Sequence, residues 1–339
     1  MSRKITKISK NIIFSLAIPA VTYVFFRVLC EATGHPGFGV GSDLQTIIYT
    51  SVYSGLIALA MFLNLTSGRL DFSIGSTLVL ATILGGNIAK ELRCSGIVFL
   101  LITLAIGALI GLVSGLVYVI LGLPPMVVSL GLAMIYEAIG FIFNKAKGVK
   151  LIGKSDLLIY ARAPENIILI IIVLAILVFL MEYTRFGYNR NALVSGQKIA
   201  VDVGINEKKN AVLCYVLAGA MLGIAGCVYL SKYGMMTPET GLSSSSYFMS
   251  AFLPIFIAGA IGRYSSAPIA VFIGAVTQAF LTSGFARMGM SNSAQAIVNN
   301  IIVLAFLIYS SNSYIFLEQR MFKEKLEAAK AARMKRQAK

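Results

Sequence analysis

The chain has 339 residues, of which 58% are hydrophobic and only 13% are charged, and its mean hydropathy is +0.83. Lys and Arg outnumber Asp and Glu by 29 to 14, which gives a formal net charge of +15. Soluble domains are about a quarter charged, so there is too little polar surface here to cover a soluble globule. The composition therefore excludes a disordered chain, a coiled coil, a disulfide-rich secreted domain and a soluble nucleic-acid binder, and it predicts a polytopic membrane protein.

The apolar residues form blocks of the length that a transmembrane helix needs. A helix crosses a hydrocarbon core of roughly 30 Å with about 20 mostly apolar residues, and continuous apolar blocks favour helices over barrel strands. We therefore predict an all-α fold with about ten transmembrane helices. The blocks are 11–29, 46–63, 72–89, 96–121, 124–143, 166–181, 210–230, 247–262, 267–286 and 296–310. The blocks at 166–181, 247–262 and 296–310 are short, and they could borrow flanking residues or enter the membrane without crossing it.

Basic residues mark both ends of the chain, 1–10 and 311–339, and they leave 11–310 as one transmembrane domain. Because basic segments stay on the cytoplasmic side, we predict that both termini are cytoplasmic. The tail from Glu318 onward is predicted to lie on anionic lipid headgroups as a basic helix. The segment 144–165 argues against this topology, since it should lie on the outer side of the membrane and yet carries five basic residues.

Between the second and third blocks the chain reads NLTSGRLDFSIGS, with almost no loop on either side. Polar residues inside apolar segments are unfavourable, so they are candidates for function. Arg69 and Asp71 can neutralise each other, and Asn64, Thr66 and Ser67 can satisfy backbone groups that a helix break frees. The alternative is a tight cytoplasmic turn whose polar groups cap two helices. The residues alone do not decide between a solute gate and a turn.

A second polar feature begins at the pair Pro124-Pro125, which ends one helix and starts the next. Ser129 then falls one turn inside the fifth block, where packing is the simplest role for it. Glu137 is the only carboxylate well inside a block. It could line a path, bond a neighbouring helix, or lie nearer the surface than the block boundaries suggest.

Glycines recur at every fourth position in two blocks, as Gly107, Gly111 and Gly115 and as Gly219 and Gly223. In apolar helices this spacing lets two backbones approach closely. We therefore predict a helix–helix packing seam there, and we assign it no role in transport.

The largest predicted cytoplasmic loop is 184–209. Ser195 can cap a short helix that ends before Gly204, because serine favours helix starts and glycine favours helix ends. A short amphipathic helix on the cytoplasmic face could dock into a groove of a soluble partner. The alternative is a solvated connector on the lipid surface.

The sequence contains none of the motifs HExxH, GxSxG or GxxxxGK[ST], which are typical of enzymes that hydrolyse peptides, esters or ATP. The single histidine, His35, does not make a metal site by itself. We predict a chain that is not an enzyme, with no catalytic residues, no metal and no cofactor of its own.

Taken together, these features resemble the permease subunits of bacterial ABC importers for ribose, galactose and related monosaccharides. The family signature Asn-x-Thr-x-Gly-x-hydrophobic-Asp-hydrophobic-Ser-x-Gly matches the chain from Asn64 to Gly75. The family's Pro-aliphatic-Val-aliphatic-Leu-Gly element resembles 125–131, and its Thr-Arg-Phe-Gly and Gly-Ile elements match 184–187 and 203–205. The resemblance covers roughly 45–310.

The chain departs from this family in three places. Two acids that usually precede the eighth span are replaced by residues 247–250, which read YFMS. The glycine-rich stretch that follows is reduced to 258–263, and the loop 190–203 lacks the usual Gly-Gly-Asn. These departures concern the sugar specificity more than the transporter class, and they raise the possibility of a divergent half paired with a second, more typical permease.

The resemblance implies a type II-like ABC importer permease in the bacterial cytoplasmic membrane, with a sugar or a sugar-like solute as cargo. Its partners would be an ABC ATPase subunit that holds ATP and Mg, a second permease chain in a homodimer or heterodimer, and an extracytoplasmic solute-binding protein. Residues implied for the substrate pathway or gate are Asn64, Thr66, Ser67, Arg69, Asp71 and Ser129. Residues implied for ATPase coupling are Gly196, Gln197, Ala200, Gly204 and Ile205.

Three alternatives remain from the sequence. One is an ABC permease for a nucleoside or another non-sugar solute. An ion-coupled secondary transporter should carry intramembrane carboxylates, and Glu137 is the only one here. A membrane scaffold or receptor would not explain the polar break at 64–71.

Overall fold

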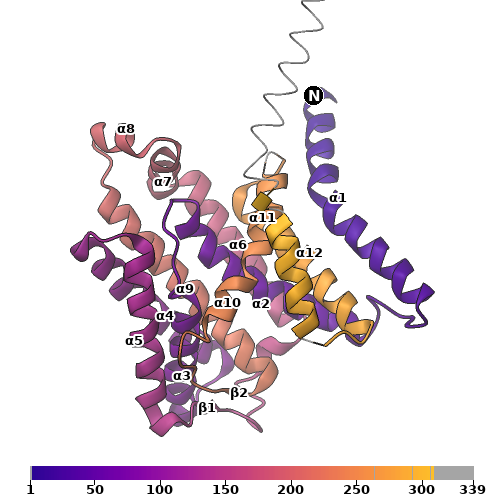
Figure 1. Cartoon of the computed structure of the whole chain (residues 1–339), viewed down its shortest axis with the longest axis horizontal. Coiled ribbons are helices and arrows are strands. Elements are labelled where there is room, and N and C mark those ends of the chain that lie inside the picture. The colour runs from indigo at the N-terminus through magenta and orange to yellow at the C-terminus, as the bar shows by residue number, and fades with distance from the viewer. Residues whose placement is uncertain (1, 263, 292, 306, 309–339) are drawn as a thin grey trace, which may run out of the picture. The chain divides into compact units, whose positions relative to one another are not determined.

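The computed structural model describes residues 2–262, 264–291, 293–305 and 307–308 (Figure 1). The chain divides into two compact units, Met1–Met290 and Ser291–Lys339. In the first unit, the helices and strands are α1 Ser2–Ala32, α2 Ser42–Leu65, α3 Ile74–Leu92, α4 Gly96–Leu121, α5 Pro125–Ile142, η1 Phe143–Ala146, β1 Val149–Lys150, η2 Ile159–Ala161, α6 Glu165–Tyr183, α7 Arg185–Ser195, α8 Gln197–Asp202, α9 Glu207–Tyr233, β2 Met235–Met236, α10 Ser245–Ser250, α11 Phe252–Ile261 and α12 Ala267–Arg287. The described part of the second unit contains the helix Ser293–Ala305. The predicted basic tail 311–339 lies outside the described residues.

Each of the ten predicted apolar blocks corresponds to a helix or a pair of helices, so the all-α prediction is confirmed. Among the described residues, seven helices are long and apolar enough to cross a membrane: α1 from Ile13, α2, α4, α5, α6, α9 and α12. The helix α3 has 19 residues, but the polar residues in its last turns lower its mean hydropathy, so it is not one of the seven. The segments Ser245–Ile261 and Ser293–Ala305 are apolar but short. The block at 166–181 borrows flanking residues and becomes the 19-residue helix α6.

The helices α2 and α9 form the centre of the first unit. In their apolar windows 78% and 72% of the residues are buried, against 28% in α4 and 33% in α6. An apolar helix with a mostly exposed surface is expected where lipid takes the place of protein contacts. The central pair therefore lies inside the bundle, and the outer helices turn their apolar side chains toward the membrane.

The predicted glycine seam is confirmed between α4 and α9. A Cβ atom added to Gly107 would overlap the backbone of Gly219 and Gly223, and one added to Gly111 would overlap Tyr215. The two backbones are therefore in direct contact, as the four-residue spacing of the glycines predicts.

A two-stranded antiparallel ladder pairs β1 with β2, with Val149 opposite Met236 and Lys150 opposite Met235. The N–H of Leu151 also donates to the carbonyl of Gly234 at 2.7 Å. These bonds hold the basic segment 144–165 against the C-terminal end of α9.

Candidate functional site

The polar residues 64–71 lie where α2 ends and α3 has yet to begin. Gly68 adopts a φ of 74°, and the N–H groups of Ser67 and Arg69 both donate to the carbonyl of Asn64. The hydroxyl of Thr66 donates to Phe62 O at 2.6 Å, and that of Ser67 donates to Leu63 O at 3.1 Å. These side chains satisfy carbonyls at the helix end, as the sequence predicts.

Asp71 is 6% exposed and holds the start of α3. Its Oδ1 accepts from the N–H and the hydroxyl of Ser73 at 2.9 and 2.6 Å, and its Oδ2 accepts from Asn64 Nδ2 at 3.4 Å. Burial raises the pKa of the Asp71 carboxyl, while these hydrogen bonds lower it. Both Arg69 and Asp71 are described, and no salt bridge joins them. The expected neutral pair is therefore replaced by a local hydrogen-bonded cap.

Two buried arginines lie near this break. Arg190 on α7 is 3% exposed; its Nη2 donates to Phe62 O at 3.2 Å and to the hydroxyl of Thr66, and its guanidinium lies 4.8 Å from the centre of the Phe62 ring. Arg69 is 4% exposed, and its Nε and Nη2 have no hydrogen-bond partner. Burial lowers the pKa of Arg190, and the nearby charge of Arg69 lowers it further. Arg190 thus ties α7 to the end of α2, a role that the sequence analysis missed because the partners are more than a hundred residues apart.

The predicted coupling segment forms two short helices, α7 and α8, which lie beyond the ends of α6 and α9 in Figure 1. The short helix does end before Gly204, whose φ is 93°, and the N–H of Ile205 closes it on the carbonyl of Ala200. The helix start differs from the expectation: Ser195 ends α7, with its hydroxyl donating to Asn191 O, and Gly196 separates α7 from α8.

The remaining coupling residues divide between internal contacts and open surface. Gln197 donates to Glu207 at 2.6 Å and so fixes α8 against the start of α9, and Ala200 is 4% exposed. In contrast, Ile199 and Val203 are 72% and 74% exposed. Ile199 lies on α8 and Val203 directly follows it, and such an exposed apolar pair at the end of the bundle is suited to contact another protein.

Ser129 contacts the break, because its hydroxyl lies 3.4 Å from Leu70 O as well as 3.1 Å from Met126 O in its own helix. Ser129 therefore joins the predicted cluster of Asn64, Thr66, Ser67 and Asp71 at one end of the bundle. The coupling helices reach the same end through Arg190.

Glu137, whose role was open, is 4% exposed and bonds a distant segment of backbone. Its two carboxylate oxygens accept from the N–H groups of Leu242 at 2.8 Å and Ser244 at 3.1 Å. Leu242 has a left-handed φ of 64°, which is uncommon outside glycine. An irregular stretch, 237–244, therefore precedes the eighth block, and Glu137 holds it in place. Within the block, Ala251 separates α10 from α11.

The comparisons define the class of protein. Residues 44–309 match the family described as the permease component of the branched-chain amino acid transport system, and the chain belongs to that family. It is a membrane-spanning transport subunit rather than an enzyme, and in this family a partner ATPase hydrolyses ATP. The predicted resemblance to ABC importer permeases is thereby confirmed.

Its curated relatives include importer permeases for three different small solutes. The chain is 22% identical to the ribose import permease protein RbsC of Escherichia coli K12, over 80% of this chain and 87% of the relative. It is 25% identical to the autoinducer 2 import system permease protein LsrD of Escherichia coli SMS-3-5, over 83% and 88%. It is 23% identical to the fructose import permease protein FruF of Bifidobacterium longum, over 96% and 94%. No solved structure matches the chain.

Proposed function

We propose that this chain forms the translocation path for a sugar or sugar-like solute in a binding-protein-dependent importer of the bacterial cytoplasmic membrane. The relatives for ribose and fructose support the solute class. The basic termini support an orientation with both ends in the cytoplasm, and this places the α2–α3 break and the coupling helices on the cytoplasmic side.

The observation that carries the mechanism is the contact of Arg190 with the end of α2. An ATPase subunit, with its ATP and Mg, would bind the exposed apolar side chains of α8 and displace α7 and α8 as it closes. Because Arg190 bonds Phe62 O and Thr66, that displacement would reach the polar break at 64–71 directly. The break is then the cytoplasmic gate, and a second permease chain and an extracytoplasmic binding protein complete the importer.

The first test is purification of the chain from its native membrane in mild detergent. An ATPase that co-purifies in equal amount supports the proposal, and a second permease would identify a heterodimer. Absence of an ATPase under conditions that preserve such complexes would overturn the coupling assignment.

A substitution at Gly196 tests the coupling surface itself. Gly196 has an extended φ of 179°, and an added Cβ would meet only Ile199 at an ordinary 3.8 Å, so Gly196→Ala should fold and transport normally. Gly196→Phe should instead lower solute uptake about tenfold by obstructing the partner, with membrane insertion unchanged. Normal uptake by Gly196→Phe would contradict the coupling role.

A further inference from the structure

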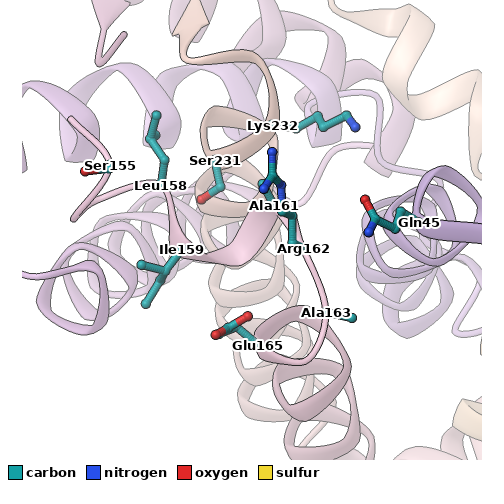
Figure 2. A pocket seen from close by; sticks show the side chains of 10 residues that line it. All are labelled: Gln45, Ser155, Leu158, Ile159, Ala161, Arg162, Ala163, Glu165, Ser231 and Lys232. Carbon is teal, nitrogen blue, oxygen red and sulfur yellow. The ribbon is translucent and has the colours of Figure 1, made fainter. Parts of the chain in front are cut away.

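A pocket of about 730 Å³ opens at the end of the bundle opposite α7 and α8. Figure 2 shows its polar side chains, which come from three separate segments: Gln45 on α2, Arg162 and Glu165 around the start of α6, and Ser231 and Lys232 at the end of α9. Small-molecule sites have volumes of about 300–1,000 Å³, so a monosaccharide fits. The proposed topology makes this the outer pocket, facing away from the cytoplasm.

One side chain connects the outer pocket to the interior. Lys232 lines the pocket, and its ammonium lies 5.5 Å from the ring centre of Tyr49. Tyr49 begins a cluster that we name the tyrosine ladder, with Tyr53 one turn further along α2 and with Tyr229 and Tyr233 on α9. Its ring centres are 4.6 to 6.1 Å apart, from the 54% exposed Tyr233 to the 3% exposed Tyr49.

Two hydroxyl groups of the ladder make no hydrogen bond within the described part of the chain. Those of Tyr49 and Tyr53 are buried and have no hydrogen-bond partner. Phenylalanine would fill the same volume without burying an unpaired hydroxyl, which is unfavourable. By contrast, the buried hydroxyl of Tyr136 on α5 pairs with Ser114 at 2.8 Å. The hydroxyls of Tyr49 and Tyr53 are therefore available to a ligand.

We propose that the outer pocket and the tyrosine ladder form one recognition site for a neutral, hydroxyl-rich solute, and that Lys232 covers its inner end. The assignment rests on the proposed function for the solute class and for the side of the membrane. Arg162, Glu165 and Gln45 supply both donors and acceptors for vicinal hydroxyls, and the carboxylate of Glu165 disfavours a phosphate group. The tyrosine rings supply apolar faces for the C–H side of a sugar and hydroxyls for its polar edge.

The first experiment measures uptake of radiolabelled D-ribose and D-fructose by cells that carry the complete importer. In Tyr49→Phe and Tyr53→Phe, uptake of the transported sugar should fall about tenfold each, as expected for the loss of one solute hydrogen bond. Stimulation of the ATPase by the loaded binding protein should persist, because the coupling helices are unchanged. The matched control Tyr136→Phe also removes a buried tyrosine hydroxyl, and its uptake should stay within about twofold.

A second experiment uses a membrane-impermeant, negatively charged thiosulfonate. The four native cysteines are free, and only Cys94 among them is partly exposed, so the background is Cys94→Ser. Reaction of the thiosulfonate with the Gln45→Cys variant should lower solute uptake about tenfold. Modified Lys90→Cys, in a separate pocket of about 500 Å³ at the same end of the bundle, should not.

The outcomes of these experiments distinguish a failure of the proposed recognition site from a failure of the proposed importer function. Unchanged uptake in both phenylalanine variants, or equal inhibition at Gln45→Cys and Lys90→Cys, overturns the recognition site while the importer stands. Transport of neither sugar by the unmodified importer contradicts the solute class that the ribose and fructose relatives support, and the assignment of the site to these sugars falls with it.

Discussion

Two irregular stretches of the transmembrane domain, 64–71 and 237–244, are stabilised in different ways. At 64–71 some contacts are local, as between the side chains of Asn64 and Asp71, while Arg190 and Ser129 bond this stretch from other helices. At 237–244 the turn depends on Glu137, which lies 105 and 107 residues away from the two N–H groups that it accepts. The first stretch therefore has several partial supports, which suits the gate proposed for it. The second stretch has local bonds, such as that of the Ser243 N–H to Thr240 O, and one distant support in Glu137.

Glu137→Ala should have the largest effect, because it leaves two N–H groups unpaired in the interior. We expect a loss of about 3 kcal/mol in the free energy of unfolding, whereas Glu137→Gln, which keeps one acceptor, should lose about half of that. Thermal unfolding of the purified complex in detergent measures both. Equal stability of the two variants and the wild type would show that the stretch 237–244 does not depend on Glu137.

Arg190→Met should change coupling more than stability. It removes the hydrogen bonds of α7 to Phe62 O and Thr66, and we expect uptake to fall about tenfold at unchanged membrane insertion. The exposed Arg185, in the same helix, provides the control Arg185→Met. Similar uptake by the two variants would show that the gate does not depend on this contact.

Asp71→Asn should have the smallest effect, below about 1 kcal/mol, because the amide keeps an acceptor for Ser73. The sign of this change in the free energy of unfolding depends on pH. Since burial raises the pKa of Asp71 in the folded state, the carboxyl contributes stability at low pH that is lost as the pH rises through that pKa. The wild type should therefore lose stability relative to Asp71→Asn as the pH rises above the ordinary carboxyl pKa of about 4. Thermal unfolding across this range, with the exposed Asp202→Asn as control, would show no such trend if Asp71 were solvated.

The sequence predicts the fold well because lipid imposes a simple rule on it. A block of about 20 apolar residues must form a helix in order to satisfy its backbone, so the helices appear at the predicted blocks. The stretch 237–244 lies before the eighth block, and hydropathy does not show that Glu137 bonds its backbone N–H groups. The block at 166–181 looked short because the polar ends of α6 are not counted by hydropathy.

In the candidate site, too, the sequence predicts some contacts and misses others. The hydroxyls of Thr66 and Ser67 act on carbonyls four residues earlier, a distance that sequence reasoning handles. The expected pair of Arg69 and Asp71 also followed from proximity, but the closer donors of Ser73 occupy the carboxylate. Arg190, Glu137 and the tyrosine ladder depend on contacts between distant helices, for which a single sequence holds no signal.

The glycine seam between α4 and α9 has a mechanical consequence. Backbones in direct contact have no side chains that can repack between them, so the two helices must move as one rigid lever. The short helix α8 leads into α9, whose 27 residues span about 40 Å. A tilt of about 5° at the α8 end would then move the far end of the lever by roughly 3.5 Å, and β2 and the segment paired with it would move along with that end.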